Sequence, residues 1–261
     1  MWNPAQYERF RDERKRPFFE LLARVDAAAP AQVVDLGCGT GDLTLVLAER
    51  WPSARVTGVD SSEAMVAEAT RRAAPERVRF ELADLAGWTA SAPVEVLFSN
   101  AALHWLPDHP ALLSRLVSLL APGGVLAFQI PANFDAPSHR RIDEVRAHPR
   151  FAATLAPVRR GQAEPLDFYE AHLAGLGLSV DAWDTTYLHV LQGEDAVLQW
   201  LLGTTLRPVL AALGPEEGKA FLDMLRPLLR ADYPATARGT PFRFTRRFVV
   251  ASKSIRSISL T

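Results

Sequence analysis

A glycine-rich turn between a short apolar segment and a helix constrains the fold more than any other feature of the sequence. Residues 33–36 are apolar apart from Asp35, and glycines follow at positions 37, 39 and 41. Glycine leaves room for the backbone to approach a ligand closely. A helix that begins directly after such a turn directs its N–H groups and the positive end of its dipole toward the same place. The pattern therefore predicts a strand, a ligand-binding turn and a helix.

Strand-like and helix-like segments alternate along the first half of the chain. The expected strands are residues 33–36, 55–59, 78–82, 94–98 and 125–130. The expected helices are residues 17–25, 42–50, a segment that Ser61 or Ser62 caps and that ends near residue 72, and 110–120. Strands that alternate with helices indicate a parallel sheet covered on both faces, and right-handed crossovers make it doubly wound. We therefore expect an α/β protein with a Rossmann-like sheet.

The pattern changes after Pro131. Residues 131–163 are rich in proline, arginine and histidine and show weak periodicity. Helical patterns then follow at about 166–176, 194–202, 205–213 and 215–231, and strand patterns at 179–190 and 244–251. We expect one domain, residues 1–261, in which the segments at about 131–163 and 193–240 form a helical lid.

Acidic residues near the glycine turn indicate which ligand it binds. Asp60 ends the second expected strand, where a carboxylate can accept the two hydroxyl hydrogens of a ribose. Asp35 suits an amino group on the ligand, whereas it would repel a pyrophosphate. Asp42 stands where a dinucleotide-binding motif carries its last glycine. S-adenosylmethionine has an amino group, a carboxylate and a ribose, so the pattern favours this methyl donor over a dinucleotide or an unliganded turn.

Four motifs in the first half of the chain resemble those of the class I S-adenosylmethionine-dependent methyltransferases. They are VVDLGCGTGDLT, GVDSSEAMV, Ala83-Asp84-Leu85 and Phe98-Ser99-Asn100. Segments along nearly the whole chain also resemble the trans-aconitate 2-methyltransferase family: WNPAQY, SNAALHWLPDH, QIPANFDAPSH, WDTTYLHVL and LRPVL. The resemblance implies a seven-stranded sheet with an antiparallel last strand. It also implies esterification of a carboxylate of trans-aconitate, a small polycarboxylic acid, with S-adenosyl-L-homocysteine as the second product.

The residues expected to bind the cofactor come from the motifs, their neighbours and the N-terminal segment. They are Tyr7, Arg16, Asp35, Gly37, Gly39, Asp60, Ser61, Asp84, Leu85 and Asn100. The resemblance implies that Tyr7 closes over the cofactor, that Arg16 holds its carboxylate and that Asp84 contacts its adenine amino group. The alternatives are an ordinary packed tyrosine, a solvated arginine in a basic run and a solvated loop aspartate.

The residues expected to bind the acid follow the fourth and fifth strands or lie in the second half of the chain. They are His104, Trp105, Gln129, Asn133, Tyr187, Arg207 and Arg246, with His189, Arg247, Arg159 and Arg160 as weaker candidates. Amide N–H groups and the guanidinium fork both donate to carboxylates. A carboxylate is already ionised at pH 7, so its methylation needs alignment more than proton removal. His104, the one possible catalytic residue, is therefore expected to contact substrate rather than act as a base.

Composition excludes several other partners. The formal net charge of -1 and the pI of about 6.6 provide no basic field for nucleic acid. No run of about 18 apolar residues predicts a membrane span, and the N-terminal segment lacks the apolar core of a signal peptide. The six histidines lack the spacing of a zinc site. With Cys38 as the one cysteine, an intramolecular disulfide is impossible. We expect a cytoplasmic monomer that binds no metal.

Two other functions remain open from the residues alone. The chain could methylate a hydroxyl or an amine of another small molecule or natural product, which would require a general base with a pKa near neutrality. It could also bind the donor without catalysis, as a regulatory module.

Overall fold

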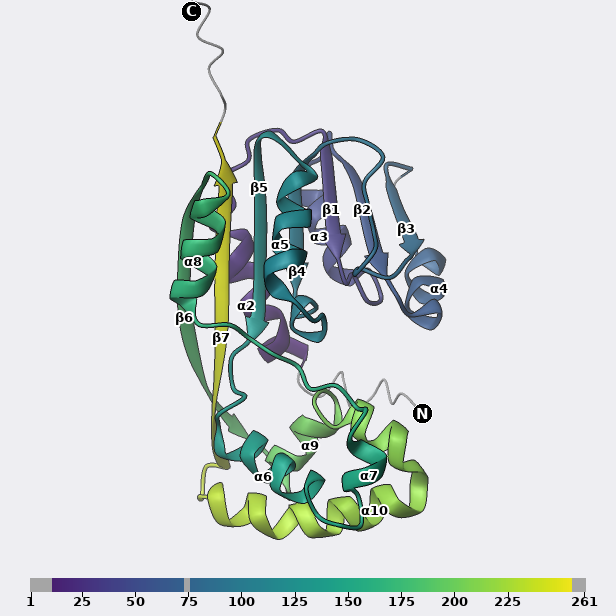
Figure 1. The fold of residues 1–261 in the computed structure, drawn as a ribbon, viewed down its shortest axis with the longest axis vertical. Helices are drawn as coiled ribbons and strands as arrows, with labels where there is room; N and C mark the ends of the chain where they lie inside the picture. Colours follow the sequence, from purple (N-terminus) through teal and green to yellow (C-terminus); the bar gives the residue numbers. More distant parts are fainter. Residues whose placement is uncertain (1–10, 73–75, 255–261) are drawn as a thin grey trace, which may run out of the picture. The chain divides into compact units, whose positions relative to one another are not determined.

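A seven-stranded sheet forms the framework of the computed structural model, which describes residues 11–72 and 76–254 (Figure 1). The strands are β1 (Gln32–Leu36), β2 (Arg55–Asp60), β3 (Val78–Leu82), β4 (Val94–Asn100), β5 (Leu120–Pro131), β6 (Leu178–Leu191) and β7 (Thr240–Lys253). Their order in the sheet is β3-β2-β1-β4-β5-β7-β6. Strands β1 to β5 pair in parallel, and β7 runs antiparallel. The expected fold class is confirmed.

Helices connect the strands and also form a separate group in the second half of the chain. They are α2 (Arg11–Leu22), α3 (Asp42–Arg50), α4 (Glu63–Arg71), α5 (His109–Ser118), α6 (Pro137–Arg146), α7 (Ala152–Leu155), α8 (Leu166–Gly175), α9 (Ala196–Leu202) and α10 (Arg207–Asp232), with a 3₁₀ turn, η1 (Leu103–Trp105). Helix α10 is kinked at Gly214, whose φ of 73° and ψ of -176° are not helical. The two helices expected on either side of position 214 are these two parts of α10.

The chain divides into two compact units. The first, here called the sheet unit, comprises Arg16–Ile130, Ala163–Asp184 and Arg247–Thr261. The second, here called the helical unit, comprises Met1–Lys15, Pro131–Gln162 and Thr185–Arg246. Strands β6 and β7 contribute residues to both. Apart from residue 163, both segments expected to form a lid belong to the helical unit, and the single domain with a lid stays a prediction.

The core of the sheet unit lies where helices cover the parallel strands. Because both faces of such strands are buried, β4 is apolar and buried along most of its length. Helices α5 and α8 pack side by side on one face (Figure 1), where Leu113 and Leu116 of α5 and Leu173 of α8 lie in one apolar cluster with Phe128 of β5. Each fully buried side chain of this kind contributes about 2 kcal/mol. Burial thus fixes the strand ends that carry the motifs.

The helical unit has a second core, in which aromatic rings pack among aliphatic side chains. The Trp200 ring lies 5.4 Å from that of Phe244, and the Phe151 ring lies 5.4 Å from that of Phe221. All four are buried.

No single described helix is long and apolar enough to cross a membrane, whereas α9 and α10, which meet at a 105° bend, pass such a test together by length and composition.

Candidate active site

The glycine turn follows β1 in the sheet unit and contains three residues with left-handed backbone. The φ values of Gly37, Gly39 and Gly41 are 80°, 54° and 78°. A Cβ on Gly37 would lie 2.2 Å from the Cβ of Ala102, whereas a Cβ on Gly39 would meet no atom of the described residues within 4 Å. Packing therefore requires glycine at position 37. The space beside Gly39 is open, as a turn that admits a ligand requires.

Asp60 at the end of β2 is fixed to the glycine turn by backbone hydrogen bonds. Its Oδ2 accepts from the N–H of Gly39 at 2.9 Å, and its Oδ1 accepts from the N–H of Ser62 at 2.9 Å. Each carboxylate oxygen keeps a second lone pair, which suits the two hydroxyls of a ribose. Ser62 is the N-cap residue of α4, as expected, but its hydroxyl makes no cap bond with the described residues. Ser61 is exposed.

Asp35 lies on β1 below the glycine turn and is buried. The hydroxyl of Thr44 donates to its Oδ2 at 2.6 Å. Burial, more than the nearby Asp60 carboxylate, raises the pKa of Asp35 from 3.8 to about 6. A cationic ligand group would stabilise the ionised form of this desolvated acid. Burial likewise raises the pKa of the Cys38 thiol, which agrees with an unreactive side chain in the turn.

Two amide side chains meet where β4 and β5 end. Asn100 and Gln129 are register partners in the sheet, and Gln129 Nε2 donates to Asn100 Oδ1 at 2.5 Å. Gln129 is 1% exposed, and among the described residues its Oε1 has no hydrogen-bond partner. Because buried polar atoms are normally satisfied, this oxygen indicates a position that a ligand could complete.

The η1 turn places His104 and Trp105 directly after β4. His104 is buried, Trp105 is 39% exposed, and their ring centroids lie 4.6 Å apart. Ala102, which precedes η1, is the residue that would clash with a side chain at Gly37. The turn therefore begins against the glycine turn.

The remaining cofactor candidates differ in exposure, and one of them lies outside the described residues. Asp84 is exposed, and its Oδ1 accepts from the N–H of Ala86 at 2.9 Å. Leu85 is buried, and Arg115 Nη2 donates to its carbonyl at 2.5 Å. Arg16 is exposed on α2, and Tyr7 lies outside the described residues.

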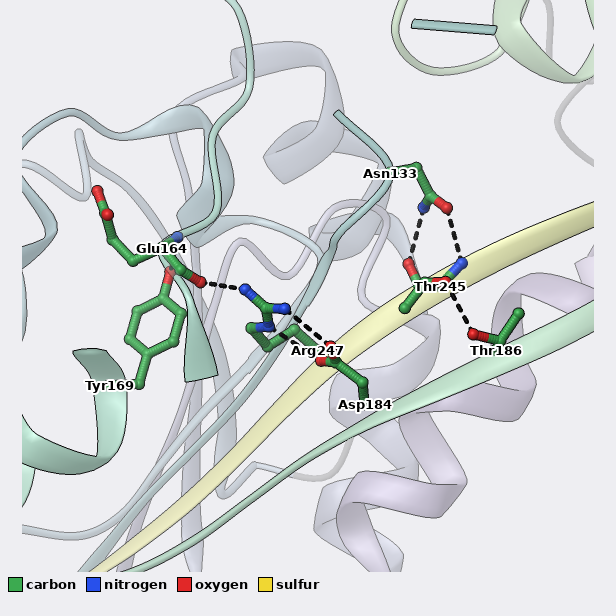
Figure 2. Close-up of polar contacts among 7 residues, drawn as sticks. All are labelled: Asn133, Glu164, Tyr169, Asp184, Thr186, Thr245 and Arg247. Atoms are coloured by element: carbon green, nitrogen blue, oxygen red, sulfur yellow. Dashed lines mark hydrogen bonds and ion pairs between the residues drawn. The ribbon is translucent and has the colours of Figure 1, made fainter. Parts of the chain in front are cut away.

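Asn133, an acid candidate in the helical unit, has a structural partner. Its Nδ2 donates to the carbonyl of Thr245, and its Oδ1 accepts from the N–H of Thr245, both at 2.7 Å (Figure 2). The Thr245 hydroxyl also contacts that of Thr186 at 2.8 Å. The amide thus pairs with β7 as a neighbouring strand would.

The other acid candidates of the helical unit differ in exposure. Tyr187 is buried and stacks on His189 at 6.1 Å. Arg246 is 6% exposed, and its guanidinium lies 4.7 Å from the Phe244 ring centroid. Arg207 is exposed at the first position of α10.

Two weaker arginine candidates form ion pairs. Arg247, in the sheet unit, binds Asp184 through Nε at 2.9 Å and Nη2 at 2.8 Å (Figure 2). Arg160, in the helical unit, pairs with Asp143 at 2.7 Å. These pairs give both arginines a structural role.

One buried polar cluster of the helical unit was not expected from the sequence. His139 has Ser138 Oγ 3.3 Å from its Nδ1 and Thr205 Oγ1 3.3 Å from its Nε2. Burial, followed by the charge of Arg160, lowers the pKa of His139 to about 4, so the ring is neutral at pH 7. The one signal was the position of Ser138 and His139 at the end of QIPANFDAPSH.

Within the described ranges, no three His, Cys, Asp or Glu side chains gather as a metal site would require.

Comparisons with known proteins identify the family of the chain. Residues 33–124 match the family model described as "Methyltransferase domain". The chain is 48% identical to a trans-aconitate 2-methyltransferase of Streptomyces avermitilis, with 97% of each chain covered. It is 48% identical to that of Streptomyces coelicolor over 97% of this chain and 86% of the relative, and 47% identical to that of Mycolicibacterium gilvum over 96% and 98%.

Solved structures share the fold at low sequence identity. The YcgJ protein from Bacillus matches with a TM-score of 0.59 and 15% identity, over 91% of this chain and 97% of that one. A Haemonchus contortus phosphoethanolamine N-methyltransferase 2 matches with a TM-score of 0.56 and 17% identity, over 92% and 52%. These structures support the fold, and the long, close matches to curated relatives decide the family. The chain is a methyltransferase that belongs to the trans-aconitate 2-methyltransferase family.

Proposed function

We propose that this protein esterifies a carboxylate of trans-aconitate with the methyl group of S-adenosylmethionine. The observation that carries the proposal is the 48% identity to a trans-aconitate 2-methyltransferase over 97% of both chains. A match of that length includes the helical unit, where most of the acid candidates lie, as well as the methyltransferase motifs.

The residues around the glycine turn fit the methyl donor. The open space at Gly39 admits a ligand to the backbone, the fixed carboxylate of Asp60 suits the ribose, and the buried acid of Asp35 suits the amino group. When bound, S-adenosylmethionine supplies a methyl group that its sulfonium already activates. The protein therefore has to hold the donor rather than activate it.

The acceptor requires alignment and no proton transfer. A carboxylate is ionised at pH 7, so the oxygen that takes the methyl group carries no proton to remove. His104 is then a contact rather than a base. We assign the binding of the carboxylates to hydrogen-bond donors such as Arg207 and Arg246, because guanidinium N–H groups match carboxylate oxygens. S-adenosyl-L-homocysteine is the second product.

A transfer assay tests the proposal. Purified protein is incubated with methyl-labelled S-adenosylmethionine and with trans-aconitate, cis-aconitate, isopropylmalate or phenolic acids. We expect label on trans-aconitate that mild base releases, because an ester hydrolyses and an ether does not. Absence of label on every acid would refute the proposal. Base-stable label on a hydroxyl or amine acceptor, with a rate that rises through a pKa near 6–7, would instead establish the alternative acceptor class. A cytoplasmic location and a monomeric state stay predictions.

A further inference from the structure

Strained backbone brackets the segment that carries His104 and Trp105. Three described non-glycine residues have positive φ, and two of them, Ala101 at 58° and Asp108 at 52°, stand on either side of η1. Left-handed backbone costs a non-glycine residue about 1–2 kcal/mol. Such conformations persist only where surrounding contacts hold them, and they concentrate at functional sites. The η1 turn therefore needs a clamp from outside its own backbone.

His109, the first residue of α5, supplies that clamp. Its ring is 2% exposed, and its Nε2 lies 3.2 Å from the carbonyl oxygen of Leu103, the first residue of η1. Its Nδ1 lies 2.7 Å from the hydroxyl of Tyr169 on α8. Tyr169 is also buried, and its hydroxyl accepts from the N–H of Glu164 at 3.0 Å.

The partners of His109 and Tyr169 determine where the proton of each of these hydrogen bonds lies. A carbonyl oxygen can only accept, so Nε2 of His109 carries the ring proton and donates to Leu103. Nδ1 is then an acceptor, and the Tyr169 hydroxyl must donate to it. The Tyr169 oxygen remains free to accept from Glu164. Burial lowers the pKa of His109 and raises that of Tyr169, so both groups stay neutral, as this arrangement requires.

At the other end of this series of hydrogen bonds, the Glu164 backbone is held by two strands. Arg247 of β7 donates to the carbonyl of Glu164 and binds the Asp184 carboxylate of β6 with two hydrogen bonds (Figure 2). Tyr169 stands beside Glu164 in the same view. The relay thus runs from the sheet to η1, entirely within the sheet unit.

We propose that His109 and Tyr169 are positioning residues, which hold the His104–Trp105 turn against the glycine turn through this relay. The inference rests on the proposed function, because it assigns η1 a place beside the reacting groups. Neither residue has to touch the donor or the acid. Loss of the bond to Leu103 frees η1 and misaligns the side chains that it carries.

A matched pair of variants separates this bond from general packing. In His109→Asn, the side chain can still accept from Tyr169 but is too short to reach the Leu103 carbonyl. In His109→Gln, an amide N–H can take the place of Nε2–H and donate to Leu103. Ser114→Ala is the control, since Ser114 of α5 contacts His172 of α8 at 3.1 Å without touching η1.

Amide hydrogen exchange reports on η1 independently of activity. The N–H of Trp105 donates to Ala102 and that of Leu106 donates to Leu103, at 3.1 and 3.0 Å. We expect His109→Asn to speed exchange of these two amides about tenfold, the factor that corresponds to one hydrogen bond of ordinary strength. His109→Gln and Ser114→Ala should stay within about threefold of the wild type. Wild-type exchange in His109→Asn, or equal acceleration in the Asn and Gln variants, would overturn the proposal.

Kinetics and ring spectroscopy complete the test. We expect kcat for trans-aconitate to fall about tenfold in His109→Asn and to recover in His109→Gln. The Kd of the donor should stay nearly unchanged in both variants. A lower kcat without faster exchange would contradict positioning through η1. If the wild type methylates no acid, the proposed function fails, whereas the exchange data still decide the relay.

Nitrogen chemical shifts of the His109 ring are the second, independent readout, should His109→Asn not fold. They should show the Nε2–H tautomer in the wild type and also in Tyr169→Phe, where the Nδ1 shift alone should move because it loses the hydrogen bond from the hydroxyl. A wild-type ring protonated at Nδ1 would refute the relay.

Discussion

Buried Asp35 and Ser99 of the sheet unit have shorter hydrogen bonds than buried His139 of the helical unit. In the sheet unit these groups have short partners: Asp35 takes the Thr44 hydroxyl at 2.6 Å, and the Ser99 hydroxyl donates to a backbone carbonyl at 2.8 Å. In the helical unit, both ring nitrogens of His139 have hydroxyls at 3.3 Å. The candidate site of the sheet unit is therefore held by short hydrogen bonds and by the backbone of the glycine turn, whereas the His139 cluster is held by longer contacts between side chains. Substitutions should separate the two.

The largest effect should come from the backbone of the sheet unit. Gly37→Ala places a Cβ 2.2 Å from that of Ala102 at a φ of 80°, so overpacking adds to the cost of left-handed backbone. We expect a loss of about 3–4 kcal/mol in the free energy of unfolding, measured by urea denaturation. Gly177→Ala is the control, because its φ is 85° and its Cβ would meet none of the described residues within 4 Å, and it should lose only about 1 kcal/mol. Equal losses would show that packing against Ala102 does not select glycine.

The free energy of unfolding should depend on pH through His139, the buried histidine of the helical unit. The pKa of His139 falls from 6.5 to about 4 in the folded state, so below pH 6.5 the unfolded chain binds a proton that folded His139 does not. Its contribution to stability is present above pH 6.5 and is lost as the pH falls toward 4, by about 3 kcal/mol. Denaturation of wild type and His139→Gln across this range should show that the difference between them shrinks. A constant difference would refute the assignment.

The contribution of Asp35 to stability should change with pH in the opposite direction. Its pKa is raised from 3.8 to about 6, so the folded state holds the proton longer, and stability falls as the pH rises through this window. Asp35→Asn removes that fall. We expect the variant to gain about 2 kcal/mol over the wild type between pH 4 and pH 8 while its affinity for the donor drops. A variant that gains no stability and binds donor normally would contradict both roles.

The arginines of the helical unit should affect the acid and leave the donor unaffected. We expect Arg246→Gln and Arg207→Ala each to raise KM for trans-aconitate about tenfold, through loss of a charge-assisted hydrogen bond, with the Kd of the donor unchanged. Arg243→Ala is the control, since Arg243 is an exposed arginine on the same strand as Arg246. Unchanged KM in both variants would remove the arginines from the acid site.

The order of elements in the sheet unit could be predicted because its signals are local. A glycine turn, a strand-end acid and an apolar run each depend on a few adjacent residues, and the structure brings Gly39 and Asp60 together as their spacing indicated. Boundaries were less certain. Pro17 was expected to begin a helix, but it lies inside α2, because proline disturbs a helix without always ending it.

Partners far apart in the chain could not be predicted. Asn133 was expected to face the acid, but its amide pairs with the backbone of Thr245, 112 residues away. His109 and Tyr169 lie 60 residues apart, and each on its own looks like an ordinary core residue. Periodicity tells which face of a helix is buried and not which side chain it meets.

The central claim is that the glycine turn of the sheet unit holds the methyl donor, and calorimetric titration with S-adenosylmethionine tests it most directly. Gly39→Ala and Gly177→Ala make a matched pair, since both positions have positive φ and neither Cβ would meet an atom within 4 Å in the part of the chain that the structure describes. Both variants should lose about 1 kcal/mol of stability. We predict that Gly39→Ala weakens donor binding at least tenfold, because the added methyl occupies the space of the ligand, while Gly177→Ala binds as the wild type does. Wild-type affinity in Gly39→Ala would contradict the account.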